Sequence, residues 1–371
     1  MSDLLVHHQG TDALAAADAA RRQQELAGSA PDASARPEAD VRTLTFAKAI
    51  NLGLRQALAD DPKVLLMGED IGRLGGVFRV TDGLQAEFGA DRVVDTPLAE
   101  SGIVGTAIGL AMRGYRSVCE IQFDGFIFPA FDQITTQLAK MHYRSRGQIQ
   151  VPVVIRVPYG GGIGAVEHHS ESPEVLFAHT AGLRVVSPSS PAEAFTMIRQ
   201  AVASPDPVLF FEPKSRYWEK GEVDVAAPLA TPHGSAGTLD RARVVRAGTD
   251  VTVVAYGPTV ATALKAAEAA AAEGTSLEVV DLRSLSPLDI DTVAASVRRT
   301  GRCVVVHEAP VLYGSGAEVA ARVTEECFFH LEAPVLRVGG FHTPYPVAKI
   351  EHDYLPSLDR VLDAVDRTLA L

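Results

Sequence analysis

The sequence has no hydrophobic run long enough to cross a membrane, although 47% of its 371 residues are hydrophobic. A spanning helix needs about 18 or more consecutive apolar residues, and no stretch approaches that length. The N-terminus also lacks the basic segment and the apolar segment of a secretory signal. We therefore expect a cytoplasmic protein with no membrane partner.

Basic residues are in short supply, with 34 Lys and Arg against 46 Asp and Glu and a net charge of −12. No basic stripe appears, which argues against a nucleic-acid-binding surface. Cysteine is also scarce, with Cys119, Cys303 and Cys327 lying far apart in the chain. Two of them lie in runs typical of strands, so we expect buried, reduced thiols.

Several catalytic motifs are missing. The sequence contains no G-x-S-x-G elbow, no C-x-x-C pair, no G-x-x-x-x-G-K-[ST] phosphate loop and no paired carboxylates on one face. These absences argue against the common serine hydrolases, dithiol enzymes and P-loop nucleotidases.

The organisation of the chain changes near Thr43. Residues 1–42, with "GSAPDASARPEAD", have few large apolar groups, and we expect a disordered tail. Strand-like and helical segments then alternate over 43–218 and again over 242–371, while the Pro- and Gly-rich residues 219–241 indicate a linker. This alternation predicts an α/β protein with two doubly wound units, each built on a mostly parallel sheet.

A glycine-rich stretch follows the strand predicted at 151–158. Gly160, Gly162 and Ala165 fit the pattern G-x-G-x-x-A, and this pattern taken alone suggests a dinucleotide-binding site. We expect no helix to begin there, because "HHSESPE" follows and Ser172–Pro173 is the better helix start. We therefore interpret the stretch as a tight loop whose backbone approaches another group closely.

This loop carries His168 and His169 to the carboxyl ends of the predicted strands, where sites of α/β proteins usually lie. A metal site that includes His179 is an alternative, but the spacing does not match a zinc ligand pattern and no cysteine accompanies it. We predict no metal. Two interpretations of these histidines remain: at least one of them has a functional role, or they are ordinary surface histidines.

Glu100 is the most unusual carboxylate. It begins an uncharged run, "SGIVGTAIGLAM", that ends only at Arg113. Burial disfavours the ionised form, whereas the N-terminus of a helix starting at Ser101 favours it. The balance suits a group that exchanges a proton near neutral pH; the alternative is an exposed acid in the first turn of a helix.

Four motifs resemble those of one family, the beta subunit of the thiamine-diphosphate-dependent 2-oxoacid dehydrogenase (decarboxylating) component. They are "GEDIG" with "GGVFRVTDGL", "DTPLAESGIVGTAIGLA", "EIQFDGFIFPAFDQI" and "GGGIGAVEHHSESPE". The resemblance runs from about Thr43 to the C-terminus, and "IQF…FPAFDQ" with "HSESPE" looks more like the branched-chain type than the pyruvate type.

The resemblance implies a transketolase-like pyrimidine-binding domain at about 43–218 and a transketolase C-terminal domain at about 242–371. It also implies an α2β2 heterotetramer in which a separate alpha subunit holds Mg²⁺ and the diphosphate of thiamine diphosphate, since the corresponding motif is absent here. The enzyme would decarboxylate a 2-oxo acid and pass the acyl group to the lipoyl arm of an acyltransferase core.

The resemblance further implies roles for individual residues. Glu100 would contact the aminopyrimidine ring of the cofactor, and Leu98, Gln122 and Phe126 would line the pocket. His169 matches a histidine that handles protons during acyl transfer. Many branched-chain members have Tyr where this chain has Phe126.

The role of His168 stays open. Some family members bind a structural potassium ion before the last large strand of the first domain. The corresponding loop, at residues 201–206, offers Asp206 as its obvious side-chain ligand, and we leave the ion unassigned.

Three classes of function are therefore compared. The first is catalysis with branched-chain 2-oxo acids, with pyruvate as the alternative substrate. The second is a non-catalytic scaffold that anchors the alpha subunit, which does not account for the pocket residues. The third is a nicotinamide-dependent oxidoreductase, which rests on the glycine loop alone.

Overall fold

The computed structural model describes residues 39–229 and 239–371. Most of the predicted tail lies outside these residues, but Val41 and Arg42, which we assigned to it, are part of strand β1. Residues Val41–Leu371 form one compact unit. In the described part of the chain, no helix has both the length and the apolar character that crossing a membrane requires.

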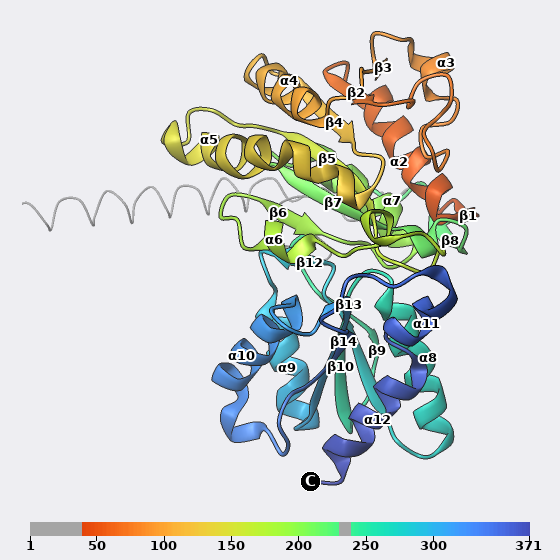
Figure 1. Ribbon diagram of the computed structural model, residues 1–371, viewed down its shortest axis with the longest axis vertical. Helices are drawn as coiled ribbons and strands as arrows, with labels where there is room; N and C mark the ends of the chain where they lie inside the picture. The colour runs from red at the N-terminus through yellow and green to blue at the C-terminus, as the bar shows by residue number, and fades with distance from the viewer. Residues whose placement is uncertain (1–38, 230–238) are drawn as a thin grey trace, which may run out of the picture. The chain divides into compact units, whose positions relative to one another are not determined.

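The first large sheet lies in the upper half of Figure 1 and has the strand order β12-β6-β7-β5-β4-β2-β3 among the described residues. Neighbouring strands are parallel except β12, which pairs antiparallel with β6. Runs such as "VVIRVPY" are buried throughout, as expected for strands covered on both faces. The strands are β2 Val64–Gly68, β3 Val93–Asp95, β4 Arg116–Glu120, β5 Val153–Tyr159, β6 Arg184–Val186, β7 Val208–Pro213 and β12 Ser284–Ser286.

Helices cover both faces of this sheet, and two separate hydrophobic clusters fill the spaces between (Figure 1). Helices α2 and α7 pack on one face, and α4 packs on the other together with η1, η2, α5 and α6. The bounds are α2 Phe46–Asp60, α3 Leu84–Phe88, α4 Glu100–Met112, η1 Asp124–Ala130, η2 Gln133–Leu138, α5 Ala139–Arg144, η3 Glu167–His169, α6 Glu174–Ala178, α7 Pro191–Ala203 and η4 Lys214–Arg216.

The second large sheet has the order β14-β13-β10-β11-β9 within the described residues, with only β9 antiparallel to its neighbour. Helices α8 and α12 cover one face, and α9 and α10 cover the other (Figure 1). The elements are β9 Arg243–Arg246, β10 Val251–Ala255, α8 Thr259–Ala272, β11 Leu277–Asp281, α9 Ile290–Thr300, β13 Cys303–Pro310, α10 Ser315–Cys327, η5 Phe328–His330, β14 Leu336–Gly340, η6 Ala348–Ile350, α11 Glu351–Tyr354 and α12 Leu358–Leu369.

A short antiparallel pair corrects part of the predicted linker. Strand β8, Lys220–Asp224, pairs with β1, Val41–Thr45. Only Val223 of β8 is buried, so the strand has little hydrophobic periodicity and its partner lies far away in the sequence. Lys220–Asp224, which lie within the predicted linker of 219–241, therefore form a strand, and residues 230–238 lie outside the described part.

The two large sheets are tied to one another. Strand β12 follows β11 in the chain, yet it joins β6 at the edge of the first sheet. Buried side chains add polar links: Tyr256 donates a hydrogen bond to Glu174 at 2.5 Å, and Ser189 donates one to Asp281 at 2.5 Å. The predicted α/β class with two doubly wound units is confirmed. The expected burial of all three unpaired cysteines is confirmed as well.

Candidate active site

The candidate site residues lie just beyond the carboxyl ends of four neighbouring strands of the first sheet. Glu69 directly follows β2, and Gln122 follows β4. The turn after β3 leads to Glu100, and the glycine-rich loop with His169 follows β5. Because β5, β4, β2 and β3 are adjacent and parallel, their carboxyl ends share one edge of the sheet. Binding sites of open α/β sheets usually form at this edge (Figure 1).

Glu100 is buried, with 8% of its surface exposed, and it is the first residue of α4. The residue before it, Ala99, offers no side-chain cap. One face of α4, with Ile103, Val104 and Ala107, is buried against the sheet. The alternative of an exposed acid in a helix first turn is therefore wrong, because Glu100 is both in the first turn and shielded from water.

Glu69 is a second buried acid beside Glu100, and the sequence analysis missed it. It is 7% exposed, and its Oε1 has no hydrogen-bond partner. Burial raises the pKa of Glu69, the charges of Glu100 and Asp70 raise that pKa further, and a hydrogen bond from the backbone N–H of Ala99 lowers it. A buried acceptor without a partner indicates a place where a polar ligand group fits.

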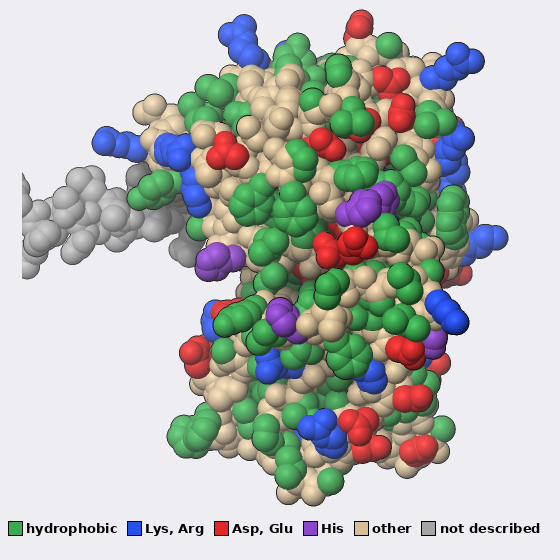
Figure 2. Space-filling model, viewed as in Figure 1, with side chains coloured by type: hydrophobic (Ala, Val, Ile, Leu, Met, Phe, Trp, Pro, Cys, Tyr) green, Lys and Arg blue, Asp and Glu red, His purple; other side chains and the backbone are tan. Residues whose placement is uncertain are grey.

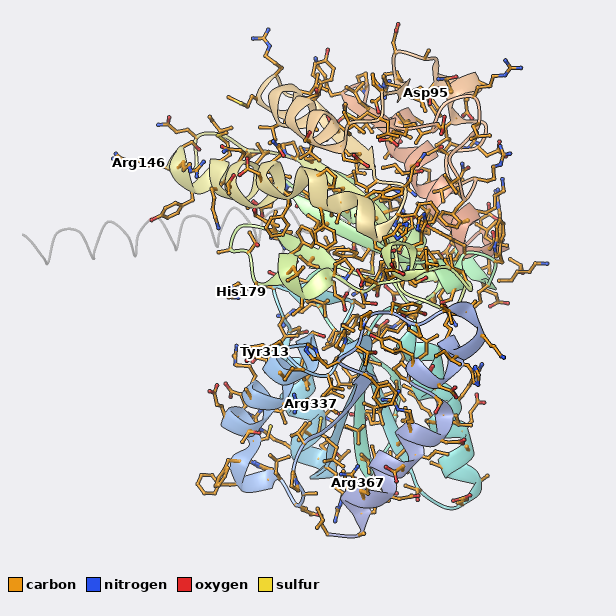
Figure 3. The ribbon with its side chains drawn as sticks, viewed as in Figure 1. Asp95, Arg146, His179, Tyr313, Arg337 and Arg367 are labelled. Carbon is orange, nitrogen blue, oxygen red and sulfur yellow. The ribbon has the colours of Figure 1, made fainter. Side chains whose placement is uncertain are left out.

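The segment that follows Glu69 is held in place by hydrogen bonds. Asp70 has a left-handed φ of 57°, which is uncommon for a residue other than glycine. Its carboxylate accepts a hydrogen bond from Gln122 Nε2 at 3.3 Å. Asp95, labelled in Figure 3, accepts one from the N–H of Gly72 at 2.6 Å. Gln122 is thereby oriented towards the turn that carries Glu69.

A cluster of aromatic and imidazole rings stands next to Gln122. The ring of His169 lies 4.2 Å from that of Phe123 and 5.3 Å from that of Phe126, between ring centres. The two aromatic rings are 5.7 Å apart, and His168 lies 4.3 Å from His169. Such edge-to-face contacts stabilise a fixed arrangement of the rings.

The environment of His169 favours the neutral imidazole. Partial burial lowers the pKa of His169, His168 and Lys214 lower it further, and Asp124 raises it. Its Nδ1 atom is buried without a hydrogen-bond partner. A neutral ring with a free nitrogen can accept a proton or a hydrogen bond from a bound group.

A buried ion pair lies beneath the rings. Lys214 donates to Asp124, and both side chains are fully buried. The Lys214 ammonium is 5.7 Å from the centre of the Phe123 ring, and the second Asp124 oxygen accepts from the N–H of Glu171 at 2.9 Å. Burial raises the pKa of Asp124 and lowers that of Lys214, while each partner opposes the shift of the other. The pair thus joins the end of β7 to the loop that carries the histidines.

Two family models match the chain. Residues 42–219 match the transketolase pyrimidine-binding domain, and residues 240–361 match the transketolase C-terminal domain. Relatives match nearly the whole chain. A pyruvate dehydrogenase E1 component subunit beta of Leifsonia xyli subsp. xyli is 64% identical over 91% of this chain and 98% of the relative.

The chain belongs to the family of beta subunits of acyl-transferring 2-oxoacid dehydrogenases. A 3-methyl-2-oxobutanoate dehydrogenase subunit beta of Mycobacterium tuberculosis is 55% identical over 88% of this chain and 92% of the relative. A solved split-gene transketolase, described as an inactive beta4 tetramer, shares the fold with a TM-score of 0.70 and 24% identity, covering 88% of this chain and 99% of that one.

The predicted preference of this beta subunit for branched-chain substrates is not supported. The pyruvate-type relative from Leifsonia is more similar than the branched-chain relatives, which are 55% and 43% identical. The short motifs that suggested the branched-chain type cover few residues, and the whole-length comparison outweighs them.

The structure of this beta subunit brings most of the predicted residues to one edge, in two linked groups. The first contains Glu100 and Gln122 with Glu69, and the second contains Phe126 and His169 with Phe123. Leu98 precedes Glu100 but is 80% exposed in this chain. The predicted closeness of Leu98 to a cofactor stays a prediction.

His179 does not join the other histidines. It follows α6 and lines a separate cavity of about 380 Å³ with Glu318 and Arg322, and Figure 3 labels it between the two sheets. No group of three or more His, Cys, Asp or Glu suited to a metal ion occurs in the described residues.

The glycine loop has the tight shape that its sequence predicts. Gly160, Gly162 and Gly164 have positive φ, and no helix begins at these glycines. The dinucleotide interpretation therefore loses the helix N-terminus that it requires. The face drawn in Figure 2 mixes hydrophobic side chains with histidines and acids rather than carrying a basic stripe.

Proposed function

We propose that this chain, together with a separate alpha subunit in an α2β2 heterotetramer, catalyses the thiamine-diphosphate-dependent oxidative decarboxylation of a 2-oxo acid. The acyl group would pass to the lipoyl group of an acyltransferase core. The observation that carries this proposal is the buried carboxyl of Glu100 beside Glu69, at the edge of the sheet where α/β proteins bind ligands.

The described residues fit the aminopyrimidine end of the cofactor. Glu69 Oε1 is a buried polar atom without a partner, as expected where a polar ligand completes the site. Glu100 would accept a hydrogen bond from, or share a proton with, the ring. Gln122 offers a second polar contact, and Phe126 offers a ring face for stacking. The alpha subunit would hold Mg²⁺ and the diphosphate.

Bound thiamine diphosphate supplies the electron sink for decarboxylation. The protein's part is to hold a proton and to exclude water. Glu100 is buried at the start of α4, and a carboxyl that is shielded from water makes a stronger hydrogen bond to a bound group. Neutral His169 can take up and return a proton at a ring nitrogen during acyl transfer.

Pyruvate is the substrate to test first, because the 64% identical relative is named a pyruvate dehydrogenase component. A branched-chain 2-oxo acid is the second candidate, because the Mycobacterium tuberculosis relative is named a 3-methyl-2-oxobutanoate dehydrogenase subunit. The assembled complex, produced with its alpha subunit, can be assayed with both acids. A higher kcat/KM with 3-methyl-2-oxobutanoate would reverse this order.

The mechanism is tested by Glu100→Gln in the assembled complex. We expect kcat to fall by about 100-fold or more, because the amide cannot exchange a proton and general acid–base groups contribute roughly 10²–10⁴-fold. Asp359→Asn is the matched control, since Asp359 is an exposed acid in the first turn of α12. Full activity of Glu100→Gln would contradict the proposed role.

A further inference from the structure

His168 and His169 lie in a loop whose two ends are joined by a hydrogen bond. The N–H of Gly160 donates to the carbonyl of Glu171 at 3.0 Å, so the two ends of residues 160–171 meet. We call residues 160–171 the histidine loop. Its first half contains the glycines with positive φ, and its second half contains η3 with His168 and His169.

The second half of the histidine loop is held by the first domain. Asp124 accepts the hydrogen bond from the N–H of Glu171, and the histidine rings pack on Phe123 and Phe126. Space is restricted here as well, because a Cβ on Gly125 would lie 2.5 Å from the carbonyl oxygen of His168.

The first half is held from the other domain by Glu351. Its Oε1 accepts from the N–H of Gly162 at 2.8 Å, and its Oε2 accepts from the N–H of Gly164 at 3.1 Å. Both carboxylate oxygens are thus used on one short stretch of backbone. Hydrogen bonds to a charged acceptor are stronger than those between neutral groups.

Neighbouring groups keep this carboxylate in place. Glu351 is 9% exposed, and Tyr345 donates a hydrogen bond to its Oε1 at 2.6 Å. Glu308 adds a third contact by accepting from the N–H of Gly161 at 3.0 Å. A Cβ on Gly161 would lie 1.8 Å from the Tyr345 hydroxyl oxygen, so the loop fits closely against the C-terminal domain.

We propose that Glu351 is a positioning residue for the histidine loop, through which the C-terminal domain fixes His169 at a site whose other side chains come from the first domain. It touches no reacting group. This inference rests on the proposed function only for the role of His169, because the hold on the loop is a property of this chain.

The test compares Glu351→Gln and Glu351→Ala with Asp353→Asn in the α2β2 complex. Asp353 is exposed on the same short helix, α11, and its carboxylate pairs with His352, with no hydrogen bond to the histidine loop among the described residues. Amide hydrogen exchange of residues 160–171 is the first measurement. We expect exchange to rise roughly tenfold or more in both Glu351 variants, the size expected for losing a charge-assisted hydrogen bond, and to be unchanged in Asp353→Asn.

Kinetics and cofactor affinity form the second measurement. We expect kcat to fall roughly 10- to 100-fold in Glu351→Ala, because displacing a reacting group by about 1 Å has an effect of that size. The affinity for thiamine diphosphate should stay within about twofold, since Glu100 is untouched. Glu351→Asp, which keeps the charge, should recover part of the kcat.

The outcomes separate this inference from the proposed function. Unchanged loop exchange and unchanged kcat in a folded Glu351→Gln complex would overturn the inference. Equal loss of cofactor affinity and kcat would also overturn it, because it would make Glu351 a general structural support. A wild-type complex inactive with either 2-oxo acid would refute the proposed function, while the exchange measurement would still decide the role of Glu351.

Discussion

Glu100 and Glu69 are buried next to one another, but their surroundings differ. Glu100 begins a helix, whose N-terminal dipole favours a negative charge. Glu69 follows a strand and faces the charges of Glu100 and Asp70, which raise its pKa. A ligand that donates a hydrogen bond to Oε1 of Glu69 would relieve an unpartnered buried atom. Pairs of acids whose environments differ in this way are typical of sites that handle protons.

The buried pair of Lys214 and Asp124 gives a stability prediction at the residue scale. Lys214→Met leaves the Asp124 charge buried without a partner, so we expect a loss of about 3–5 kcal/mol in the free energy of unfolding. The free energy of unfolding is measured by urea unfolding of the wild type and the variant. The double variant with Asp124→Asn should recover much of that loss, since no uncompensated charge remains. Equal losses in the single and double variants would contradict this explanation.

At the scale of elements, the pairing of β1 with β8 adds a two-stranded ribbon that packs on the first domain. Val223 of β8 is buried in the same hydrophobic cluster as α2 and α7, whereas Glu222 beside it is exposed. The strand therefore contributes one side chain to the core, which is too little for a periodic signal. A two-stranded ribbon of this kind depends on the helices beneath it.

Truncation of Val223 tests that dependence. Val223→Ala should lower the free energy of unfolding by about 2 kcal/mol, between the usual costs of losing one methyl group and three. Glu222→Ala, on the opposite face of the same strand, should change it by less than about 0.5 kcal/mol. Both values come from urea unfolding. If the two variants behave alike, β8 does not pack as described.

At the scale of the whole molecule, the two domains meet through carboxyl groups that are buried or partly buried. Burial raises the pKa of Glu174 to about 7 and that of Glu308 to about 7. Glu174 accepts a hydrogen bond from Tyr256 of the other domain, and Glu308 accepts one from Gly161. Asp281, with its pKa also raised to about 7 by burial, lies at the same junction.

These groups predict a dependence of stability on pH. In the unfolded chain Glu174 titrates near pH 4.5, so between about pH 4.5 and 7 the folded chain binds more protons than the unfolded chain. The contribution of Glu174 to the free energy of unfolding therefore falls as the pH rises, by at most about 1.4 kcal/mol per pH unit. It is fully present below the unfolded pKa and lost as the pH passes the folded pKa.

The measurement is a comparison with Glu174→Gln at several pH values. Relative to that variant, the wild type should lose stability between pH 5 and pH 7 in urea unfolding. Glu222→Gln serves as the exposed control and should follow the wild type. A constant difference between Glu174→Gln and the wild type across this range would show that Glu174 does not hold a proton in the folded chain.

The sequence alone determined the fold class and predicted part of the candidate site. Alternating buried strands and helices can pack in few ways, so the α/β class follows from local pattern. Glu100 could be found because an acid stands out in an uncharged run. The glycines marked the loop that carries His168 and His169, and the choice of His169 came from the family resemblance. Glu69 was missed, because a polar residue directly after a strand is typical of an ordinary loop and gives no signal of a site.

Tertiary structure alone decided the pairings between distant residues. Asp124 and Lys214 are 90 positions apart, and Glu351 is 189 positions from Gly162. No local pattern records such contacts, because hydrogen bonds and ion pairs depend on distances that only the folded chain sets. Local pattern thus determined most of the strands and helices, but not the pairing of β1 with β8, while packing decided which distant side chains meet.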